Sequence, residues 1–443
     1  MRALNDLKKL SAAFSIILAT MLVADDTNLS QEQNSTVLFN DQQMSPEEQA
    51  ASVGSLDDYL SELKRKQFGY EYEKTDQESL KLRDSWIRPV MLQYSINRSN
   101  PYNENDAADS ENQNAAIILD QPIFQSGGII YGVKFANASR EFANYSIDQQ
   151  KRIMIKQTID LLMQVKQSEL TIEKQHLQIS NSSINLEQKQ EQYLNGQLDS
   201  GFLNNAIIEK NVVTQALFDL ETRNYQLISQ FKKLSDLDPK TAKIPFLAIV
   251  DEERFLEQNI DVKLAESESE KNRLFKNVTL VKYLPAVNLQ ASYNWQKQDS
   301  VFPAGGNLIS NTSETDYYRY GLKASMPLDI NSYNDFEAAR VEYLKSIVVI
   351  DDKKRELQLL FDQVMDNLIN YDKKINLAEE NRKLYATLLA DTENLFRAGY
   401  KTQYDVDILS NSMKIEVINQ KIFEIDKQLE LLTLYEKMSS DVQ

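Results

Sequence analysis

The hydrophobic and polar positions in the first half of the chain predict one very long helix and an antiparallel partner. Residues 129–194 contain no Pro and only Gly132 as glycine, and their apolar side chains recur at helical spacing. A helix of roughly 65 residues is about 100 Å long at 1.5 Å per residue. A turn near Gly196 follows, and a second helical pattern covers residues 203–234. Together they predict a helical hairpin over residues 129–234.

The second half of the chain repeats this order. A Pro-free helical pattern covers residues 336–398, Gly399 marks a turn, and a last helix covers residues 403–438. These segments predict a second helical hairpin over residues 336–438.

Spacing supports an internal repeat. The interval from Pro122 to Gly196 is nearly the same as the interval from Pro327 to Gly399. The two helical rods are therefore expected to extend equally far in one direction. The predicted organisation is a first repeat over residues 56–238, a linker over 239–250 and a second repeat over 251–438.

Ahead of each helical hairpin the pattern changes to period two, which is typical of strands with one apolar face. Residues 86–124 and 286–328 are each predicted to form a β-hairpin, preceded by short helical segments within residues 56–83 and 251–282. The alternating apolar positions are Val90, Leu92, Tyr94 and Ile96, then Val287, Leu289, Ala291, Tyr293 and Trp295, then Tyr318, Tyr320, Leu322, Ala324 and Met326. The polar acidic stretch 98–114 predicts a loop, and Pro303, Gly305 and Gly306 predict another. The fold class is thus mainly α with a small β part.

These strands have the length of membrane strands. The clear alternating segments are about ten residues long, and transmembrane barrel strands need about 9–11 residues. A small soluble sandwich with one wet face is the alternative explanation. Four strands cannot close a barrel, and open edges are not tolerated in lipid. Strands in a membrane would therefore require several chains to share one barrel, and three chains would supply twelve strands.

The first long helix carries two apolar stripes with seven-residue spacing. Stripes that are two residues apart lie about 200° apart around a helix, whereas a two-stranded coiled coil needs a single seam. Opposed stripes favour a helix with a neighbour on each side, as in a cylinder of helices, and a plain antiparallel hairpin is the alternative. The stripes are Met163, Leu170, Leu177 and Ile184, and Val165, Ile172, Ile179, Leu186 and Tyr193.

The N-terminus predicts export. Residues 1–24 have the order of a secretory signal peptide: basic residues, an apolar run over 12–23 and Ala24 before an acidic pair. The run is short for a membrane span, although an N-terminal anchor is the alternative. Residues 25–55 are polar and predict a flexible lead-in. An exported chain of this kind is expected to be periplasmic, secreted or an outer-membrane β protein.

Composition removes several classes of function. The chain has 66 acidic and 49 basic residues and a net charge of −17, which argues against binding nucleic acid by phosphate neutralisation. It has no Cys and one His, so thiolate metal sites, disulfides and His clusters drop out. No catalytic constellation, metal site or cofactor site is evident, and we predict a non-enzymatic protein. If the strands or helices enclose a pore, the excess of acidic residues suggests that its lumen would favour cations.

The order of these elements resembles the TolC-like outer-membrane channel family, the exit ducts of tripartite efflux pumps and type I secretion systems. The resemblance covers residues 56–438. It is carried by the order and spacing of several short motifs: Ser85-Trp86-Ile87-Arg88-Pro89, Gln121-Pro122-Ile123-Phe124, Tyr193-Leu194-Asn195-Gly196, Tyr283-Leu284-Pro285-Ala286 and Phe396-Arg397-Ala398-Gly399.

The resemblance implies a homotrimer in the outer membrane of a Gram-negative bacterium, with a twelve-stranded β-barrel and a large periplasmic helical cylinder. It implies contact with outer-membrane lipid, a periplasmic adaptor protein and an inner-membrane pump, and it implies extracellular loops at residues 98–114 and 298–315. The adaptor would meet the turns of the two helical hairpins, at Gly196, Leu203, Gly399, Thr402 and Val406.

The resemblance also implies a periplasmic aperture at the second turn. Asp405 takes the first of two acidic positions of the family, six residues after Gly399, and Phe396 and Lys401 match an aromatic and a basic position beside it. Ile408 replaces the second acid.

The closing network of this aperture is therefore predicted to be altered or absent. In the family, an acidic residue six positions after the first turn glycine takes part in this network, and Phe202 occupies that position in this chain. Asp405 could instead be a solvated acid at a helix N-terminus beside Thr402, where the helix dipole favours it.

The sequence thus predicts an outer-membrane channel that passes drugs or secreted polypeptides. A periplasmic adaptor is one alternative, although it would have one helical hairpin and a glycine-rich β domain. A structural coiled-coil protein is another, although it should lack the alternating strands.

Overall fold

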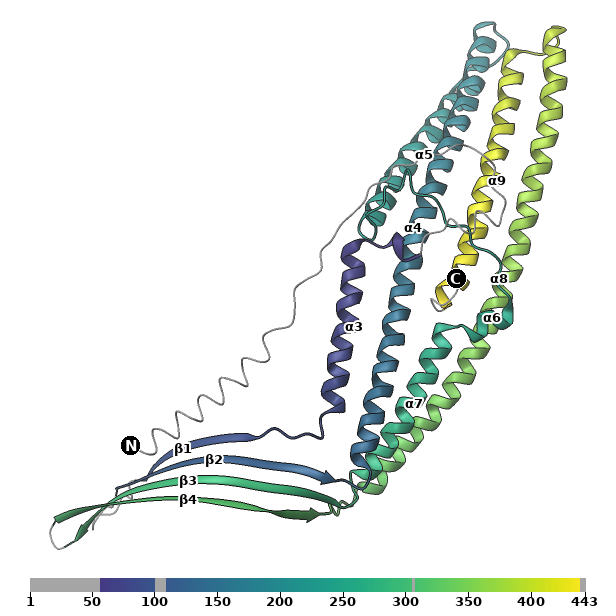
Figure 1. Ribbon diagram of the computed structural model, residues 1–443. Coiled ribbons are helices and arrows are strands. Elements are labelled where there is room, and N and C mark those ends of the chain that lie inside the picture. Colours follow the sequence, from purple (N-terminus) through teal and green to yellow (C-terminus); the bar gives the residue numbers. More distant parts are fainter. Residues whose placement is uncertain (1–55, 100–108, 305–306, 439–443) are drawn as a thin grey trace, which may run out of the picture. The chain divides into compact units, whose positions relative to one another are not determined.

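The computed structural model describes residues 56–99, 109–304 and 307–438. The predicted signal peptide (1–24) and lead-in (25–55) lie outside the described residues. Within these ranges the chain is mainly helical, with a four-stranded antiparallel sheet (Figure 1). The predicted mainly α fold with a small β part is confirmed.

Four long helices form two antiparallel hairpins. Helix α4 (Gly128–Leu194) is followed by α5 (Ser200–Lys232), and α8 (Ser332–Arg397) by α9 (Gln403–Lys437). Helices α4 and α8 contain 67 and 66 residues. At 1.5 Å per residue both are about 100 Å long.

Shorter helices flank the hairpins. The 3₁₀ helix η1 (Leu56–Tyr59) and α3 (Glu62–Arg83) precede the first pair of strands, and α6 (Glu252–Glu257) and α7 (Ile260–Val281) precede the second. Helix α4 contacts α5 and α9, and also α3 and α7, while α8 contacts α9 and α7 (Figure 1). The order across the hairpins is therefore α5, α4, α9, α8, and α5 and α8 stand at its edges.

The two sides of α4 pack against different helices. Val165 belongs to an apolar cluster with Phe231 of α5, whereas Met163 belongs to a cluster with Leu431 and Leu434 of α9. The side chains of Val165, Met163, Phe231 and Leu434 are fully buried. The first residues of the two opposed stripes, Met163 and Val165, therefore face two different neighbours.

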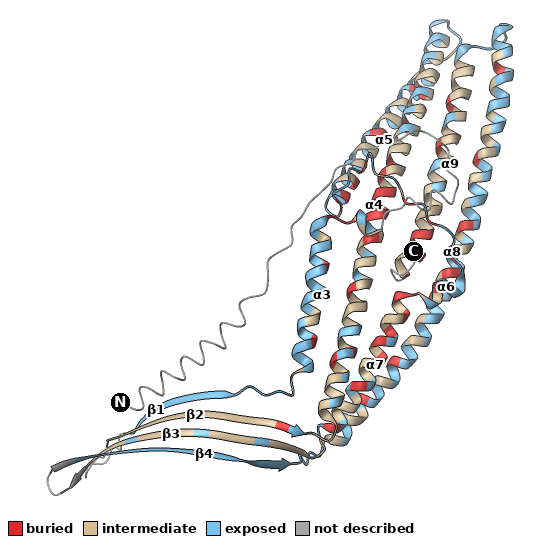
Figure 2. Cartoon of the chain, viewed as in Figure 1, coloured by how far each residue is buried: buried red, intermediate tan, exposed pale blue. Residues whose placement is uncertain are grey.

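The sheet has the strand order β1 (Met91–Ser99), β2 (Asp109–Phe124), β3 (Ala286–Ala304) and β4 (Asn307–Ser325). All neighbours are antiparallel, and the β2–β3 pairing joins the two halves of the chain. Figure 2 shows the edge strands β1 and β4 exposed along their length, while β2 and β3 between them are half-buried.

The strands differ from those expected from the sequence. Strand β1 starts at Met91 and not at residue 86, and β2, β3 and β4 contain 16, 19 and 19 residues instead of about ten. Both expected loops are wrong in extent. The β1–β2 ladder covers 98–99 and 109–114 of the loop expected over 98–114, and the β3–β4 ladder continues through 298–315 as far as Ala304 opposite Asn307. Polar residues on both faces remove the period-two signal there, but backbone hydrogen bonding does not depend on side-chain polarity.

Candidate functional site

The register of the sheet separates its side chains into two faces, since directly paired residues point to the same side. We call one the apolar face; between Val287 and Trp295 it is almost wholly apolar. Its apolar members there are Leu92, Tyr94, Ala115, Ile117, Leu119, Phe124, Val287, Leu289, Ala291, Tyr293, Trp295, Tyr318, Tyr320, Leu322 and Ala324, and Gln121 and Asp316 are its polar members. The stretch from Val287 to Trp295 is about 26 Å long at 3.3 Å per residue, close to the apolar band of a membrane barrel.

The apolar face ends in charged residues. Trp295 donates its indole N–H to Glu314 at 2.7 Å, and beyond it Arg98 pairs with Glu111 at 2.7 Å and Lys297 with Asp299 at 2.8 Å. Aromatic side chains followed by charges mark the edge of a lipid-facing band.

We call the other side of the sheet the polar face. Asn288 Nδ2 donates to Asp120 at 2.9 Å, and Gln296 Nε2 donates to Asn112 at 3.2 Å, which confirms that these residues share it. Its polar members include Gln93, Ser95, Asn97, Asn112, Asn114, Asp120, Asn288, Gln290, Ser292, Asn294, Gln296, Thr315, Tyr317, Arg319, Lys323 and Ser325, and Met91, Ala116 and Ile118 are among its apolar members. Alternation between an apolar and a polar face suits a wall between lipid and water.

The turns of the two helical hairpins are built alike. Gly196 and Gly399 both have positive φ, 68° and 82°. Each directly follows the C-cap residue of a long helix, Asn195 for α4 and Ala398 for α8. Gly196 N–H donates to Tyr193 O, and the amide of the next residue, Gln197, donates to Gln192 O. This is the Schellman arrangement, which satisfies carbonyls left free at a helix C-terminus.

The second turn repeats these bonds. Gly399 N–H donates to Phe396 O, and Tyr400 N–H donates to Leu395 O. Three residues after each glycine stands the N-cap of the next helix, Asp199 in the first turn and Thr402 in the second. The local structure of the turns therefore follows the sequence repeat.

Asp405 closes a capping box at the start of α9. Its carboxylate accepts the backbone N–H of Thr402 at 3.0 Å, while the Thr402 hydroxyl accepts the N–H of Asp405. Lys401 Nζ lies 3.5 Å from Asp405 Oδ1. The hydrogen bond from the Thr402 backbone is the main cause that lowers the pKa of the Asp405 carboxyl, so the group is held ionised.

The other predicted tip residues occupy equivalent places in the two hairpins. Leu203 and Val406 are each the fourth residue of their helix and half-buried. Phe396 lies in the last turn of α8 with 40% of its surface exposed. The structure thus brings Asp405, Lys401 and Thr402 together, whereas Phe396 is described in a different bond, which its carbonyl accepts from Gly399 N–H.

A link between the hairpins was not predicted. Tyr404 in the first turn of α9 donates its hydroxyl to Glu191 in the last turn of α4, at 3.2 Å. Burial, followed by this hydrogen bond, raises the pKa of Tyr404. Each residue lies five positions from its turn glycine, and that equal spacing is the sequence signal that could have indicated the pair.

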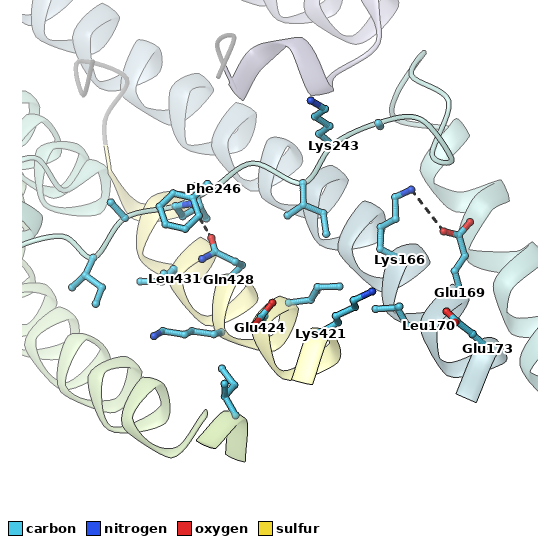
Figure 3. Close-up of a pocket in the computed structure, with 18 residues that line it drawn as sticks. Lys166, Glu169, Leu170, Glu173, Lys243, Phe246, Lys421, Glu424, Gln428 and Leu431 are labelled. Atoms are coloured by element: carbon cyan, nitrogen blue, oxygen red, sulfur yellow. Dashed lines mark hydrogen bonds and ion pairs between the residues drawn. The ribbon is translucent and has the colours of Figure 1, made fainter. Parts of the chain in front are cut away.

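The linker between the halves, residues 239–250, lies across α4 and α9 and forms one wall of a mainly apolar cavity of about 1080 Å³ (Figure 3). Leu247 N–H donates to Gln428 of α9 at 2.8 Å, and Lys166 of α4 donates to Lys240 O at 2.7 Å. These bonds fix the linker to the helices well away from the turns.

Other chemistry is sparse. Among the residues described, no group of three or more His, Cys, Asp or Glu side chains could hold a metal ion. Within the same residues, no helix combines the length and the apolar character of a membrane span.

An amphipathic four-stranded sheet attached to two equal helical hairpins defines the class of outer-membrane channel folds, and comparison with solved structures agrees. The chain matches the outer membrane protein VceC from Vibrio cholerae with a TM-score of 0.62 at 14% identity, over 88% of this chain and 95% of that one. It matches the CmeC outer membrane channel of Campylobacter jejuni with a TM-score of 0.65 at 11% identity, over 95% and 96%.

A third match is the open state of the MtrE outer membrane channel of Neisseria gonorrhoeae, with a TM-score of 0.58 at 11% identity over 95% of this chain and 99% of that one. No protein-family model and no curated protein sequence matches the chain. The likeness covers almost the whole of each structure, and this chain has the TolC-like outer-membrane channel fold.

Proposed function

We propose that this protein is a non-enzymatic outer-membrane channel of a Gram-negative bacterium. It forms a homotrimer and serves as the exit duct of a tripartite efflux pump or type I secretion system. A periplasmic adaptor and an inner-membrane pump deliver its cargo.

The observation that carries this proposal is that the sheet and the helices both end in uncovered edges. Strands β1 and β4 are the edges of the sheet, and α5 and α8 are the edges of the helical order. A sheet edge in lipid would leave backbone groups unsatisfied. Joining β4 to β1 of the next chain, and α8 to α5 of the next chain, removes both kinds of edge in one closed ring.

The exposed apolar side chains fit this assembly. Val212 of α5 and Leu384 of α8 are 61% and 57% exposed, although each lies on a long helix whose other side is packed. Tyr318 and Tyr320 on the apolar face are 74% and 80% exposed. Helix–helix contact would cover the first two residues, and lipid would cover the tyrosines.

The hairpin turns are the proposed contact for the adaptor. Gly196 and Gly399 shape two turns of one design, and Leu203 and Val406 follow each turn at the same position. Asp405, with Phe396 and Lys401, is proposed to lie at the periplasmic aperture, where three copies of Asp405 would attract cations.

Purification and conductance test this proposal. The protein is expected to require detergent, to fractionate with the outer membrane and to migrate as a trimer, and to produce discrete single-channel currents in a planar bilayer. A monomeric protein that remains soluble without detergent and gives no currents would contradict it.

A further inference from the structure

We propose that the barrel wall carries a ring of positive charge, formed by Arg319 and Lys323, that makes the membrane section of the channel selective for anionic solutes. The inference rests on the proposed trimeric channel, in which the polar face of the sheet lines the pore. It assigns to this section the opposite sign from that suggested by the net charge of the whole chain.

The register places few charged residues on the polar face. In the strand residues whose side chains the structure describes, these are Asp120, Arg319 and Lys323. Arg319 is opposite Ser292 and Lys323 is opposite Asn288, so both bases point to the same side as the Asn and Gln residues of β3. The remaining charged residues of the strands belong to the apolar face, at its aromatic end or beyond it.

The single acid on the polar face is already neutralised. Arg88 lies 2.8 Å from Asp120, and Asn288 donates a further hydrogen bond to the same carboxylate at 2.9 Å. The guanidinium of Arg319 instead lies over the ring of Tyr317, 4.9 Å from its centroid, on the same face. Among the strand residues whose side chains the structure describes, the polar face therefore has a surplus of two positive charges in each chain, or six in the proposed trimer.

The wall is recessed between the two bases. Gly321 lies between them on the same face, and a hollow of about 420 Å³ is lined by Gly321, Asp120, Gln290, Ser292 and Arg319 among others. No side chain projects from Gly321 to shield the two cationic groups, and both residues are exposed.

Rings of Arg or Lys side chains are how pores favour anions. Because the Debye length is about 10 Å at 0.1 M salt, charges on the wall influence solutes near it at low salt and less at 1 M. Carboxylate- or phosphate-bearing solutes are the class expected to pass this section most readily.

The test is the reversal potential of single channels under a KCl gradient. Relative to the unmodified channel, the double variant Arg319→Gln/Lys323→Gln should raise the K⁺/Cl⁻ permeability ratio at least about two-fold near 0.1 M, with a smaller change near 1 M. Asp120→Asn frees Arg88 and should lower the ratio. Lys297→Gln removes a base from the apolar face and should leave it unchanged.

Chemical modification provides a second arm, because the chain has no Cys. In Lys323→Cys channels, a sulfonate-bearing thiol reagent should raise the permeability ratio, and an ammonium-bearing reagent should restore that of the unmodified protein. If neither the double variant nor the reagents change the permeability ratio of channels with normal conductance, this inference is overturned and the proposed channel remains intact. An unmodified protein that conducts no current would overturn the proposed function, and this inference with it.

Discussion

Gly399 holds a backbone conformation that other residues adopt only at a cost. Its φ is 82°, and nothing lies within 4 Å of where a Cβ would be, so a substitution there is opposed by the backbone and not by a clash. Gly399→Ala should destabilise the turn by about 1–2 kcal/mol, which speeds amide exchange at Tyr400 roughly 5–30-fold. Hydrogen-exchange mass spectrometry measures this.

Gly201→Ala is the matched control. Gly201 lies in the first turn of α5, without positive φ, and an added Cβ would meet Asp199 at an ordinary 3.5 Å. Alanine favours helix, so this variant should leave exchange unchanged or slow it. Equal effects of the two variants would refute the argument from φ.

Asp405 caps helix α9, and its proposed role in the pore can be tested separately from this one. As a pore residue, it should give the channel part of its cation preference, and Asp405→Asn should lower that preference. An unchanged reversal potential would remove Asp405 from the pore and leave it as a helix cap.

The capping role depends on pH. Because the pKa of Asp405 is lowered, the ionised group stabilises the start of α9 above the ordinary carboxyl value of 3.8, and this stabilisation is lost as the pH falls through the lowered pKa. Exchange protection in the first turn of α9 should be constant between about pH 5 and 8 and fall at about pH 4 and below. In Asp405→Asn channels this acid-dependent loss should disappear.

At the scale of elements, Asp426 is a partly buried acid between two helices. Burial raises its pKa, although Gln167 of α4 donates a hydrogen bond to it at 2.5 Å and the charge of Lys374 acts in the opposite direction. A carboxyl with a raised pKa favours the folded state at acid pH and loses that contribution as the pH rises. Asp426→Asn should therefore raise the melting temperature of the protein at pH 7, and the advantage should shrink toward pH 4.

Asp372→Asn provides the comparison for that variant. Asp372 is half-exposed and pairs with Lys427 at 2.6 Å, so its removal should cost at most about 1 kcal/mol. A stabilisation by Asp372→Asn as large as that by Asp426→Asn would show that burial is not the cause.

The sequence predicts the helices better than the strands. The ends of α4 and α8 are marked by Gly196 and Gly399, which supply the positive φ of a helix cap, and the apolar stripes set the direction of each face. The parts of β3 and β4 beyond Trp295 have no such marker. The residues there are mostly polar, and they continue a hydrogen-bonded ladder that begins in the apolar part of the two strands.

The structure at the turns of the two helical hairpins is only partly predictable, because some of its contacts are local in sequence and others are not. The capping box of Thr402 and Asp405 is local in sequence and could be inferred. The bond between Tyr404 and Glu191 spans 213 positions and depends on the two hairpin turns standing level.

At the scale of the whole molecule, the two hairpin turns lie at the same height. In the proposed trimer this predicts which residues of adjacent chains are in contact. Val212 follows Gly196 by almost the same interval as that by which Leu384 precedes Gly399, so the two side chains lie at nearly the same height above the turns. In a chain without Cys, Val212→Cys combined with Leu384→Cys should form covalent trimers on oxidation. Denaturing electrophoresis without reductant measures this.

The control moves one cysteine around the helix. Arg382 is two residues from Leu384, about 200° away on α8. Val212→Cys with Arg382→Cys should give little cross-linked trimer. If the two pairs cross-link equally, or only within one chain, the proposed contact between α5 and α8 of adjacent chains is wrong.

The continued pairing of β3 with β4 has a practical result for work on intact cells. The ladder extends nine residues past Trp295 to Ala304, about 30 Å along the strand at 3.3 Å per residue. In the proposed channel, a peptide epitope inserted after Ala304 would be displayed well above the bilayer surface, where an antibody could reach it without permeabilisation.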